Sequence, residues 1–519
     1  MEIFLYHNLA TVSEVTAHSG VKMQFIKETK SICPECLRVI QAQIIEDQGK
    51  VLIKKTCPQH GYYEDVYWSS YERYQQAMRY YTEGTKLENP RTQEVEGCPY
   101  DCGICPSHKS STMLAIIDLT NRCNLNCPIC FANANNPDVP YIYEVSTEQV
   151  KGIIDNLASN KPIPPSALQF SGGEPTLRDD LPELIRYAGT HGIDHKEVNT
   201  NGLRLSRDRG YFERLRDAGM DTLYLSFEGL TAEPYVKSRG LDLHEMKFKV
   251  VENSRRIGFN SIMLVPTIAR GINEDQLGDI IRYAAKNQDV ISGVNGQPIS
   301  LAGRVNAEER RNLRITIPEV TRLIEEQTDG QIKQTDFYPV PFVASVARAI
   351  GAIRGKIYPD FSVHPCCGVG TFVFAEGDKI VPINRYINVG KFVESLSNVA
   401  KYSTEGKGIR SKLELLKSLR HVKLGILRTL ISSLYKKGTY SSLAKIMHKM
   451  IMVGMMHFMD AYNFDLQRVQ MCAIHYALPD GRIIPFCTYN TIHRSNFEAK
   501  FGTPKAKLPL VLQPSKTCI

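Results

Sequence analysis

Short apolar segments alternate with amphipathic segments through the middle of the chain. The amphipathic segments, such as 248–258 and 275–286, repeat apolar residues every three or four positions, which predicts helices. The apolar run at 112–119 is consistent with a buried parallel strand, and strand-like runs recur at 167–170, 196–199, 222–227, 261–265 and 290–294. Six strand–helix repeats predict an α/β fold in which a parallel sheet closes into a partial (β/α)6 barrel.

A different pattern precedes the barrel. Residues 39–55 alternate as two strands around an Asp-Gln-Gly turn, and a CPxC or CPxH knuckle stands at either end. The two knuckles offer four metal ligands, Cys33, Cys36, Cys57 and His60. They predict a rubredoxin-like or zinc-ribbon-like module that holds zinc(II) or a single iron ion, with a neighbouring cysteine as the alternative to His60.

Composition narrows the class of protein. With 519 residues the chain is long enough for about three domains, and 43% hydrophobic residues supply a substantial core. The net charge of +8 indicates no particular partner by itself. We expect an intracellular protein, because the N-terminus lacks a basic segment followed by an apolar one. No apolar run approaches the ~18 residues that a membrane span requires.

Fourteen cysteines in 519 residues are too few for a disulfide-stapled secreted scaffold. Apart from the ribbon and the isolated Cys518, they form three groups: Cys98, Cys102 and Cys105; Cys123, Cys127 and Cys130; and Cys366, Cys367, Cys472 and Cys487. Short spacings place thiolates on one loop, where a metal can gather them. The first group suits an auxiliary [4Fe–4S] cluster, with His108 or a distant residue as fourth ligand, or half of a zinc site. The last group suits a fully ligated auxiliary cluster, or two pairs of buried thiols.

The middle group has the sequence CNLNCPIC. Its CxxxCxxC spacing resembles the motif of the radical S-adenosylmethionine (SAM) superfamily, with Ile129 where family members often have an aromatic residue. The resemblance implies a [4Fe–4S] cluster held by Cys123, Cys127 and Cys130, whose fourth iron binds SAM. Reductive cleavage of SAM would yield a 5′-deoxyadenosyl radical, which removes hydrogen from unactivated C–H bonds in an oxygen-sensitive enzyme.

Other residues that match this family follow the predicted strands, where barrel sites lie. Residues 171–175 (SGGEP) match the motif that binds the SAM amino group. Asn201 is predicted to contact the SAM carboxylate or ribose, or to cap a helix, and Gln297 to face the substrate. The residues implied to bind SAM are Ile129 at the adenine, Gly172, Gly173, Glu174 and Asn201, and, at the ribose hydroxyls, Ser226 and Glu228.

The C-terminal region contains a basic stretch. Residues 401–450 carry twelve Lys and Arg against two Glu, with leucines spaced as on an amphipathic helix. Such a helix is typical of a membrane surface, or it packs its apolar face on the barrel. The Met-rich stretch 447–459 fits a core element or an apolar substrate tunnel.

The cysteine groups divide the chain into four expected parts. These are a metal ribbon with a linker helix (1–90), an auxiliary iron–sulfur loop (91–110), the barrel (111–330) and a mixed, helix-rich C-terminal domain that holds a cluster (331–519).

Nearly the whole chain resembles an archaeal branch of radical SAM enzymes, which includes tetraether lipid synthases and class D methylases described as acting on dihydropterin. We favour the lipid synthases, which join the ends of isoprenoid chains. They imply SAM, a radical SAM [4Fe–4S] cluster, two auxiliary [4Fe–4S] clusters and one mononuclear iron (or zinc). They also imply a lipid substrate with isoprenoid tails, a cytoplasmic enzyme on the inner membrane surface, an electron donor such as ferredoxin, and no nucleic acid. The alternatives are a C-methyltransferase for 7,8-dihydro-6-hydroxymethylpterin and a non-catalytic zinc-ribbon protein that binds nucleic acid.

Overall fold

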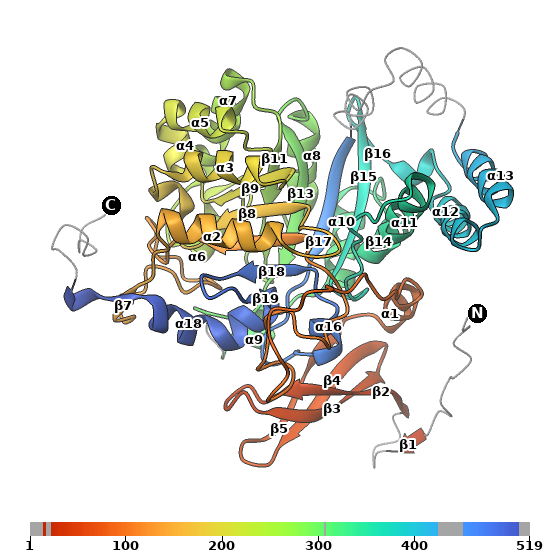
Figure 1. Cartoon of the computed structure of the whole chain (residues 1–519), viewed down its shortest axis with the longest axis horizontal. Helices are drawn as coiled ribbons and strands as arrows, with labels where there is room; N and C mark the ends of the chain where they lie inside the picture. The colour runs from red at the N-terminus through yellow and green to blue at the C-terminus, as the bar shows by residue number, and fades with distance from the viewer. Residues whose placement is uncertain (1–13, 17–21, 306–307, 424–449, 508–519) are drawn as a thin grey trace.

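The structure is a computed structural model that describes residues 14–16, 22–305, 308–423 and 450–507. Its N-terminal part is a five-stranded antiparallel sheet, seen below the rest of the molecule in Figure 1. The strands are β1 (Glu14–Thr16), β2 (Lys22–Ile32), β3 (Val39–Asp47), β4 (Lys50–Cys57) and β5 (Gly61–Trp68). β3 and β4 are the two strands expected around the Asp-Gln-Gly turn, and helix α1 (Tyr71–Met78) follows the ribbon.

A parallel sheet forms the centre of the molecule. Its strands are β6 (Leu114–Asp118), β8 (Ala167–Ser171), β9 (His195–Thr200), β10 (Thr222–Ser226), β11 (Ile262–Val265) and β13 (Ile291–Pro298). They lie side by side in chain order, and each neighbouring pair is parallel. All six predicted strands are confirmed, as is the partial (β/α)6 barrel.

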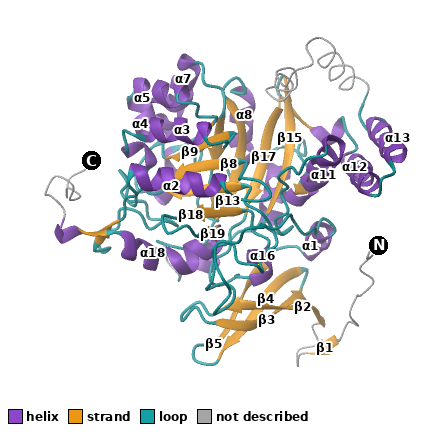
Figure 2. Cartoon of the chain, viewed as in Figure 1, coloured by secondary structure: helices purple, strands orange, loops and turns teal. Residues whose placement is uncertain are grey.

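Helices cover the outer face of this sheet, as Figure 2 shows for α2, α3, α5 and α7. They are α2 (Thr147–Ala158), α3 (Leu181–Thr190), α5 (Arg209–Asp217), α7 (His244–Ile257) and α8 (Leu277–Lys286). The α3 side chains Leu184 and Ile185 are fully buried, like Leu168 and Phe170 of β8. Amphipathic helices and apolar strands bury each other's apolar faces, and for this reason the sequence pattern predicts that these helices pack on the sheet.

C-terminal residues extend the barrel sheet at both edges. β18 (Ile474–Ala477) pairs in parallel with β6, and β17 (Met450–Met456) pairs in parallel with β13. Beyond them lie β19 (Ile483–Pro485) on one side and β15 (Gly368–Glu376), β14 (Tyr338–Pro339) and β16 (Lys379–Pro382) on the other. β18 and β19 form the expected hairpin. Strands from both sides of the boundary expected at residue 330 therefore belong to one sheet.

Residues Met450–Met456 of the Met-rich stretch form a strand, and Phe458 and Met459 beyond it line the barrel cavity described below. Met455 is buried within β17, which lies between β13 and β15. The basic stretch begins in two helices, α12 (Val389–Thr404) and α13 (Gly408–Leu419), and residues 424–449 lie outside the described residues. Among the described residues, no helix has the length and apolar character needed to cross a membrane.

The other α-helices and strands of the described residues connect or flank these layers. They are α4 (Leu203–Arg207), α6 (Ala232–Arg239), α9 (Arg310–Leu313), α10 (Ile317–Gln327), α11 (Ala344–Arg354), α16 (Leu466–Gln470), α17 (Phe486–Thr488), α18 (Arg494–Phe501), β7 (Tyr141–Ile142), β12 (Thr267–Ile268) and β20 (Thr503–Pro504).

The ribbon docks on the loop before α16. Ser31 Oγ donates to the carbonyl oxygen of Phe464 (2.6 Å), and the carboxylate of Asp465 accepts from the hydroxyls of Thr29 (2.7 Å) and Tyr67 (2.8 Å). All these side chains are buried, so the contact is part of the core.

Candidate active site

A cavity of about 150 Å³ opens at the C-terminal ends of the barrel strands. Parallel strands bring their following loops together at this edge, which is where barrel enzymes place their sites. The cavity brings together most of the predicted residues: Cys123, Ile129, Cys127, Cys130, Gly172, Gly173, Glu174, Asn201, Ser226 and Gln297. Glu228 is the predicted residue that the cavity lining lacks.

The three cysteines of the loop after β6 face this cavity. The backbone N–H of Leu125 donates to Cys123 Sγ (3.4 Å), and Arg304 Nε donates to the carbonyl oxygen of Cys127 (2.7 Å). Burial raises the pKa of the Cys127 thiol, and the nearby Arg239 opposes this by favouring the thiolate. Three thiols on one wall, with cations beside them, fit a cluster that leaves one iron for another ligand.

The two glycines after β8 are required by the backbone of the cysteine loop. Gly172 has φ +127°, a conformation that L side chains rarely adopt. A Cβ on Gly173 would lie 2.7 Å from the carbonyl carbon of Arg122. A backbone hydrogen bond holds the two segments together: the N–H of Glu174, the residue after the glycines, donates to the carbonyl oxygen of Arg122 (2.9 Å). The sequence predicts that these glycines let backbone approach a ligand; in the structure they let it approach the segment that carries Cys123.

Glu174 is nearly fully buried, and protein donors occupy both of its carboxylate oxygens. Oε1 accepts from the hydroxyls of Thr176 (2.5 Å) and Thr200 (2.6 Å), and Oε2 accepts from the backbone N–H of Asn201 (2.8 Å). Asn201 Oδ1 accepts from the backbone N–H of Leu203 (3.0 Å), the first residue of α4, whose N-cap residue is Gly202. Glu174 thus joins the ends of β8 and β9 at the cavity wall.

Glu228 acts through an arginine that sequence reasoning missed. It is fully buried, its carboxylate pairs with Arg239, and its Oε2 accepts from Thr267 N (3.0 Å). Burial opposes the charge on Arg239, but the Glu228 carboxylate raises the pKa of Arg239 above its usual value. Arg239 lines the cavity beside Cys127. Of the two predicted ribose ligands, Ser226 alone is in the cavity lining.

A second missed residue, Lys247, supports the cavity floor. Its ammonium group donates to the carbonyl oxygen of Asn201 (2.5 Å) and to Ser226 Oγ (3.0 Å). Burial, reinforced by Arg239, lowers its pKa to about 8. Nothing in the sequence singles out a lysine within an ordinary amphipathic helix, because its contacts depend on the packing of α7 against β10.

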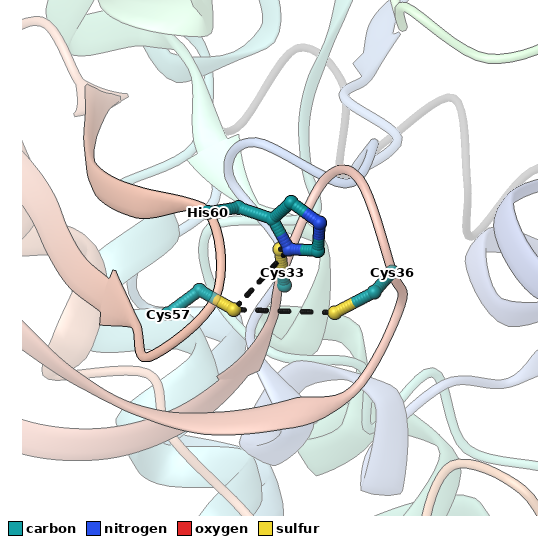
Figure 3. A group of neighbouring side chains, drawn as sticks. All are labelled: Cys33, Cys36, Cys57 and His60. Carbon is teal, nitrogen blue, oxygen red and sulfur yellow. Dashed lines mark hydrogen bonds between the residues drawn. The ribbon is translucent and has the colours of Figure 1, made fainter.

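The ribbon brings its four predicted ligands to one point (Figure 3). His60 Nδ1 lies 3.5 Å from Cys57 Sγ and 3.6 Å from Cys33 Sγ, and Cys36 Sγ lies 3.9 Å from Cys57 Sγ. Tetrahedral ligands with metal–sulfur bonds of about 2.3 Å are separated by roughly 3.8 Å. A backbone hydrogen bond from Gln59 lowers the pKa of Cys57 to about 6, which favours the thiolate that a metal needs.

Known proteins share these features. Residues 117–284 match the family described as the radical SAM superfamily, and residues 25–69 match the HMPTM N-terminal zinc ribbon domain. Over 494 residues the chain is 47% identical to the 7,8-dihydro-6-hydroxymethylpterin dimethyltransferase of Methanocaldococcus jannaschii, covering 92% of this chain and 96% of that protein.

The chain belongs to the radical SAM superfamily, in the same family as that enzyme.

More distant similarities cover less than half of the chain. The Fe-coproporphyrin III synthase of Methanosarcina barkeri is 30% identical over 239 residues, covering 43% of this chain and 56% of that protein. The solved structure of Streptococcus suis SuiB bound to S-adenosylmethionine is 17% identical, with a TM-score of 0.35, covering 43% of this chain and 48% of that one.

The comparisons correct the favoured prediction. The near full-length relative is a methyltransferase named for a pterin, so the assignment as a lipid synthase is wrong. The isoprenoid lipid substrate and the membrane surface inferred from it are wrong as well. The pattern misled because exposed basic and apolar positions on a helix do not identify what they contact. The radical SAM enzyme uses SAM and a [4Fe–4S] cluster, and its ribbon fits a mononuclear metal.

The first auxiliary cysteine group lies next to a residue of the C-terminal region. Cys98 and Cys102 are neighbours, and Cys102 is also near Thr488, next to Cys487. His108 Nε2 faces the carbonyl oxygen of Cys472 (2.7 Å), beside the last cysteine group. The predicted role of His108 as a ligand of the first group therefore has no support from its contacts.

The last cysteine group has one arginine as a common neighbour. Cys366, Cys367 and Cys487 all lie near the Arg468 guanidinium, and Cys472 lies near Cys367. Burial raises the pKa of both Cys366 and Cys472 to about 12. In the described part of the chain, the ribbon set is the one whose ligand atoms all lie within 4.8 Å. The ligand atoms of the other described cysteine groups are not gathered this closely.

Proposed function

We propose that this radical SAM enzyme attaches methyl groups to carbon atoms of 7,8-dihydro-6-hydroxymethylpterin. The observation that carries the proposal is the 47% identity to the pterin dimethyltransferase, which extends over 96% of that protein. This similarity extends well beyond residues 117–284 of the superfamily match, and residues 25–69 match a zinc ribbon domain separately.

The wall of the barrel supports a heterocyclic substrate over a hydrocarbon one. Asn199, Tyr224 and Gln297 line the cavity from three strands, and each is only half-buried. Gln297 Nε2 and Asn295 Nδ2 both donate to the Tyr224 hydroxyl oxygen, at 3.3 and 2.5 Å. That leaves the tyrosine proton and the carboxamide oxygens for a ligand.

A pterin suits this wall because its ring edge alternates amide and amino groups. A saturated chain would desolvate the same carboxamides without replacing their hydrogen bonds, at a cost of several kcal/mol. Behind the wall, Gln169 Nε2 donates to Glu197 Oε2 (2.8 Å), so the polar character continues into the barrel.

In this proposal, Cys123, Cys127 and Cys130 hold the cluster, and Ile129, Gly172, Gly173, Glu174, Asn201 and Ser226 form the SAM site, with Glu228 acting through Arg239. When bound, the cluster and SAM supply a radical that abstracts hydrogen from a C–H bond. Arg239 offsets thiolate charge beside Cys127, and Lys247 fixes Asn201 and Ser226. The stacked rings of Phe458 and Phe486, with centroids 3.8 Å apart, form an apolar part of the cavity wall.

The other cysteines complete the set of metal sites. We assign one auxiliary [4Fe–4S] cluster to Cys366, Cys367, Cys472 and Cys487, and a second to Cys98, Cys102 and Cys105. We assign one mononuclear iron or zinc ion to Cys33, Cys36, Cys57 and His60. The mononuclear site then belongs to the ribbon segment predicted at 1–90, and the second auxiliary cluster belongs to the loop predicted at 91–110.

Substrate-stimulated SAM cleavage tests the proposal. The iron-loaded enzyme is incubated anaerobically with SAM, a chemical reductant and the dihydropterin, and 5′-deoxyadenosine is measured. We expect stimulation by the pterin and a loss of about tenfold to a hundredfold in Gln297→Leu, because a buried hydrogen-bonding group loses its partner. Gln41→Leu makes the same chemical change on an exposed position of β3 and should behave as wild type. A wild-type enzyme that cleaves SAM equally with and without pterin would refute the proposal.

A further inference from the structure

One buried arginine lies among the four cysteines of the last group. Arg468 comes from α16 and is 1% exposed. Its neighbours include Cys366, Cys367 and Cys487, and its guanidinium carbon lies 5.5 Å from the centre of the Tyr67 ring. The side chain therefore reaches from the ribbon contact to the sulfur atoms.

The guanidinium has donors without partners. Nη2 donates to the carbonyl oxygens of His457 (2.9 Å) and Cys366 (3.4 Å). Nε and Nη1 are both buried and have no hydrogen-bond partner among the described residues. Buried polar groups of folded proteins nearly always have a hydrogen-bond partner. Two unpaired N–H groups on one guanidinium therefore indicate that a hydrogen-bond acceptor binds beside Arg468.

The charge of Arg468 also lacks a carboxylate. Among the described residues no Asp or Glu forms an ion pair with it, and the nearby Asp465 is held by Thr29 and Tyr67. Arg314 shows what a balanced buried arginine in this chain looks like: it pairs with Asp460 (2.8 Å) and Asp65 (3.0 Å). An unpaired buried cation is strongly unfavourable. Among the described residues, the cysteine thiols beside Arg468 would supply the missing negative charge once they bind a cluster as thiolates.

We propose that Arg468 is the positioning and redox-tuning residue of the auxiliary cluster held by Cys366, Cys367, Cys472 and Cys487, donating hydrogen bonds from Nε and Nη1 to its sulfur atoms. The inference rests on the cluster assignment made above. A fixed cation and two N–H donors stabilise the more negative, reduced cluster, so they raise its reduction potential. The cluster then accepts an electron more readily than it would in an apolar pocket.

An electron paramagnetic resonance titration of the iron-loaded full-length enzyme tests this. The auxiliary signal is first identified as the one that Cys366→Ala removes. Its midpoint potential is then measured in wild type, Arg468→Gln, Arg468→Lys and the control Arg314→Lys. We expect Arg468→Gln to change the reduced-to-oxidised ratio at fixed potential at least tenfold, which is about 59 mV downward for one electron. Arg468→Lys keeps the charge and should shift less, and Arg314→Lys should not shift.

Each outcome decides a separate point. An unchanged midpoint in Arg468→Gln with full iron content would overturn the role of Arg468. So would loss of this iron in both Arg468 variants, since a scaffold role alone predicts it. If Cys366→Ala leaves iron content and every signal unchanged, the cluster assignment itself is wrong, whatever Arg468 does. Retention of the cluster in Arg468→Lys with its loss in Arg468→Gln would support a charge-dependent contact.

Discussion

Adding one methyl group at Gly173 should remove the radical SAM cluster while leaving the fold intact. The new Cβ would lie 2.7 Å from the Arg122 carbonyl carbon, whereas ordinary contacts begin at 3.4 Å, so the loop must move by at least 0.7 Å (3.4 − 2.7). Cys123 is the next residue along that loop. Metal–ligand distances tolerate deviations of about 0.2 Å, and the shift is more than three times larger. Overpacking of this kind costs about 1–3 kcal/mol, which a chain of this size survives.

The assay counts iron and sulfide per chain and records the cluster's magnetic resonance spectrum with and without SAM. Gly173→Ala should lack the iron of one [4Fe–4S] cluster and the signal that SAM perturbs, while the ribbon metal remains. Gly152→Ala is the matched control, because a Cβ at this position would meet no atom within 4 Å and alanine stabilises helix α2 by about 1 kcal/mol. A Gly173→Ala enzyme with full iron whose spectrum still responds to SAM would show that the close approach does not position Cys123.

Three further outcomes follow from buried charges and the ribbon. Glu228→Gln leaves Arg239 without its carboxylate and should lower the free energy of unfolding in urea by about 3–5 kcal/mol; an unchanged urea midpoint would contradict the pairing seen here. Lys247 has a folded-state pKa of about 8 against an ordinary 10.5, so the unfolded chain binds the proton more tightly and stability rises between these pH values. The rise should be about 3 kcal/mol and absent in Lys247→Met, and equal slopes in the two proteins would refute it. His60→Ala should weaken ribbon metal affinity about tenfold or more in chelator competition, whereas His60→Cys should retain the metal; equal affinity in His60→Ala would remove the histidine from the site.

Periodicity predicted the barrel because each strand and helix buries a face that the chain's own pattern defines. Leu168 and Phe170, for example, are both fully buried where the apolar run places them. The cysteine spacings likewise predicted the ribbon, whose four ligands converge without help from distant elements. Local signals therefore sufficed for the parts of the molecule built from local contacts.

The pairing of strands that are distant in the chain could not be predicted from the sequence. The apolar Met450–Met456 segment fits a tunnel, a helix or a strand equally well, and its place between β13 and β15 depends on residues far away in the chain. No sequence motif identifies Arg239 or Arg468, because the residues that they contact come from other helices and strands. A substrate leaves still less trace, and the basic stretch favoured a lipid although the cavity wall is polar at Asn199 and Gln297.

Methylation of a pterin can be tested most directly by the mass spectrum of pterins in a folate-producing bacterial host that expresses this chain. We expect 6-hydroxymethylpterin species heavier by one or two methyl groups, present with the wild-type chain and absent with Cys127→Ala. Unmodified pterins in both cultures, from cells whose wild-type enzyme is iron-loaded and cleaves SAM, would contradict it.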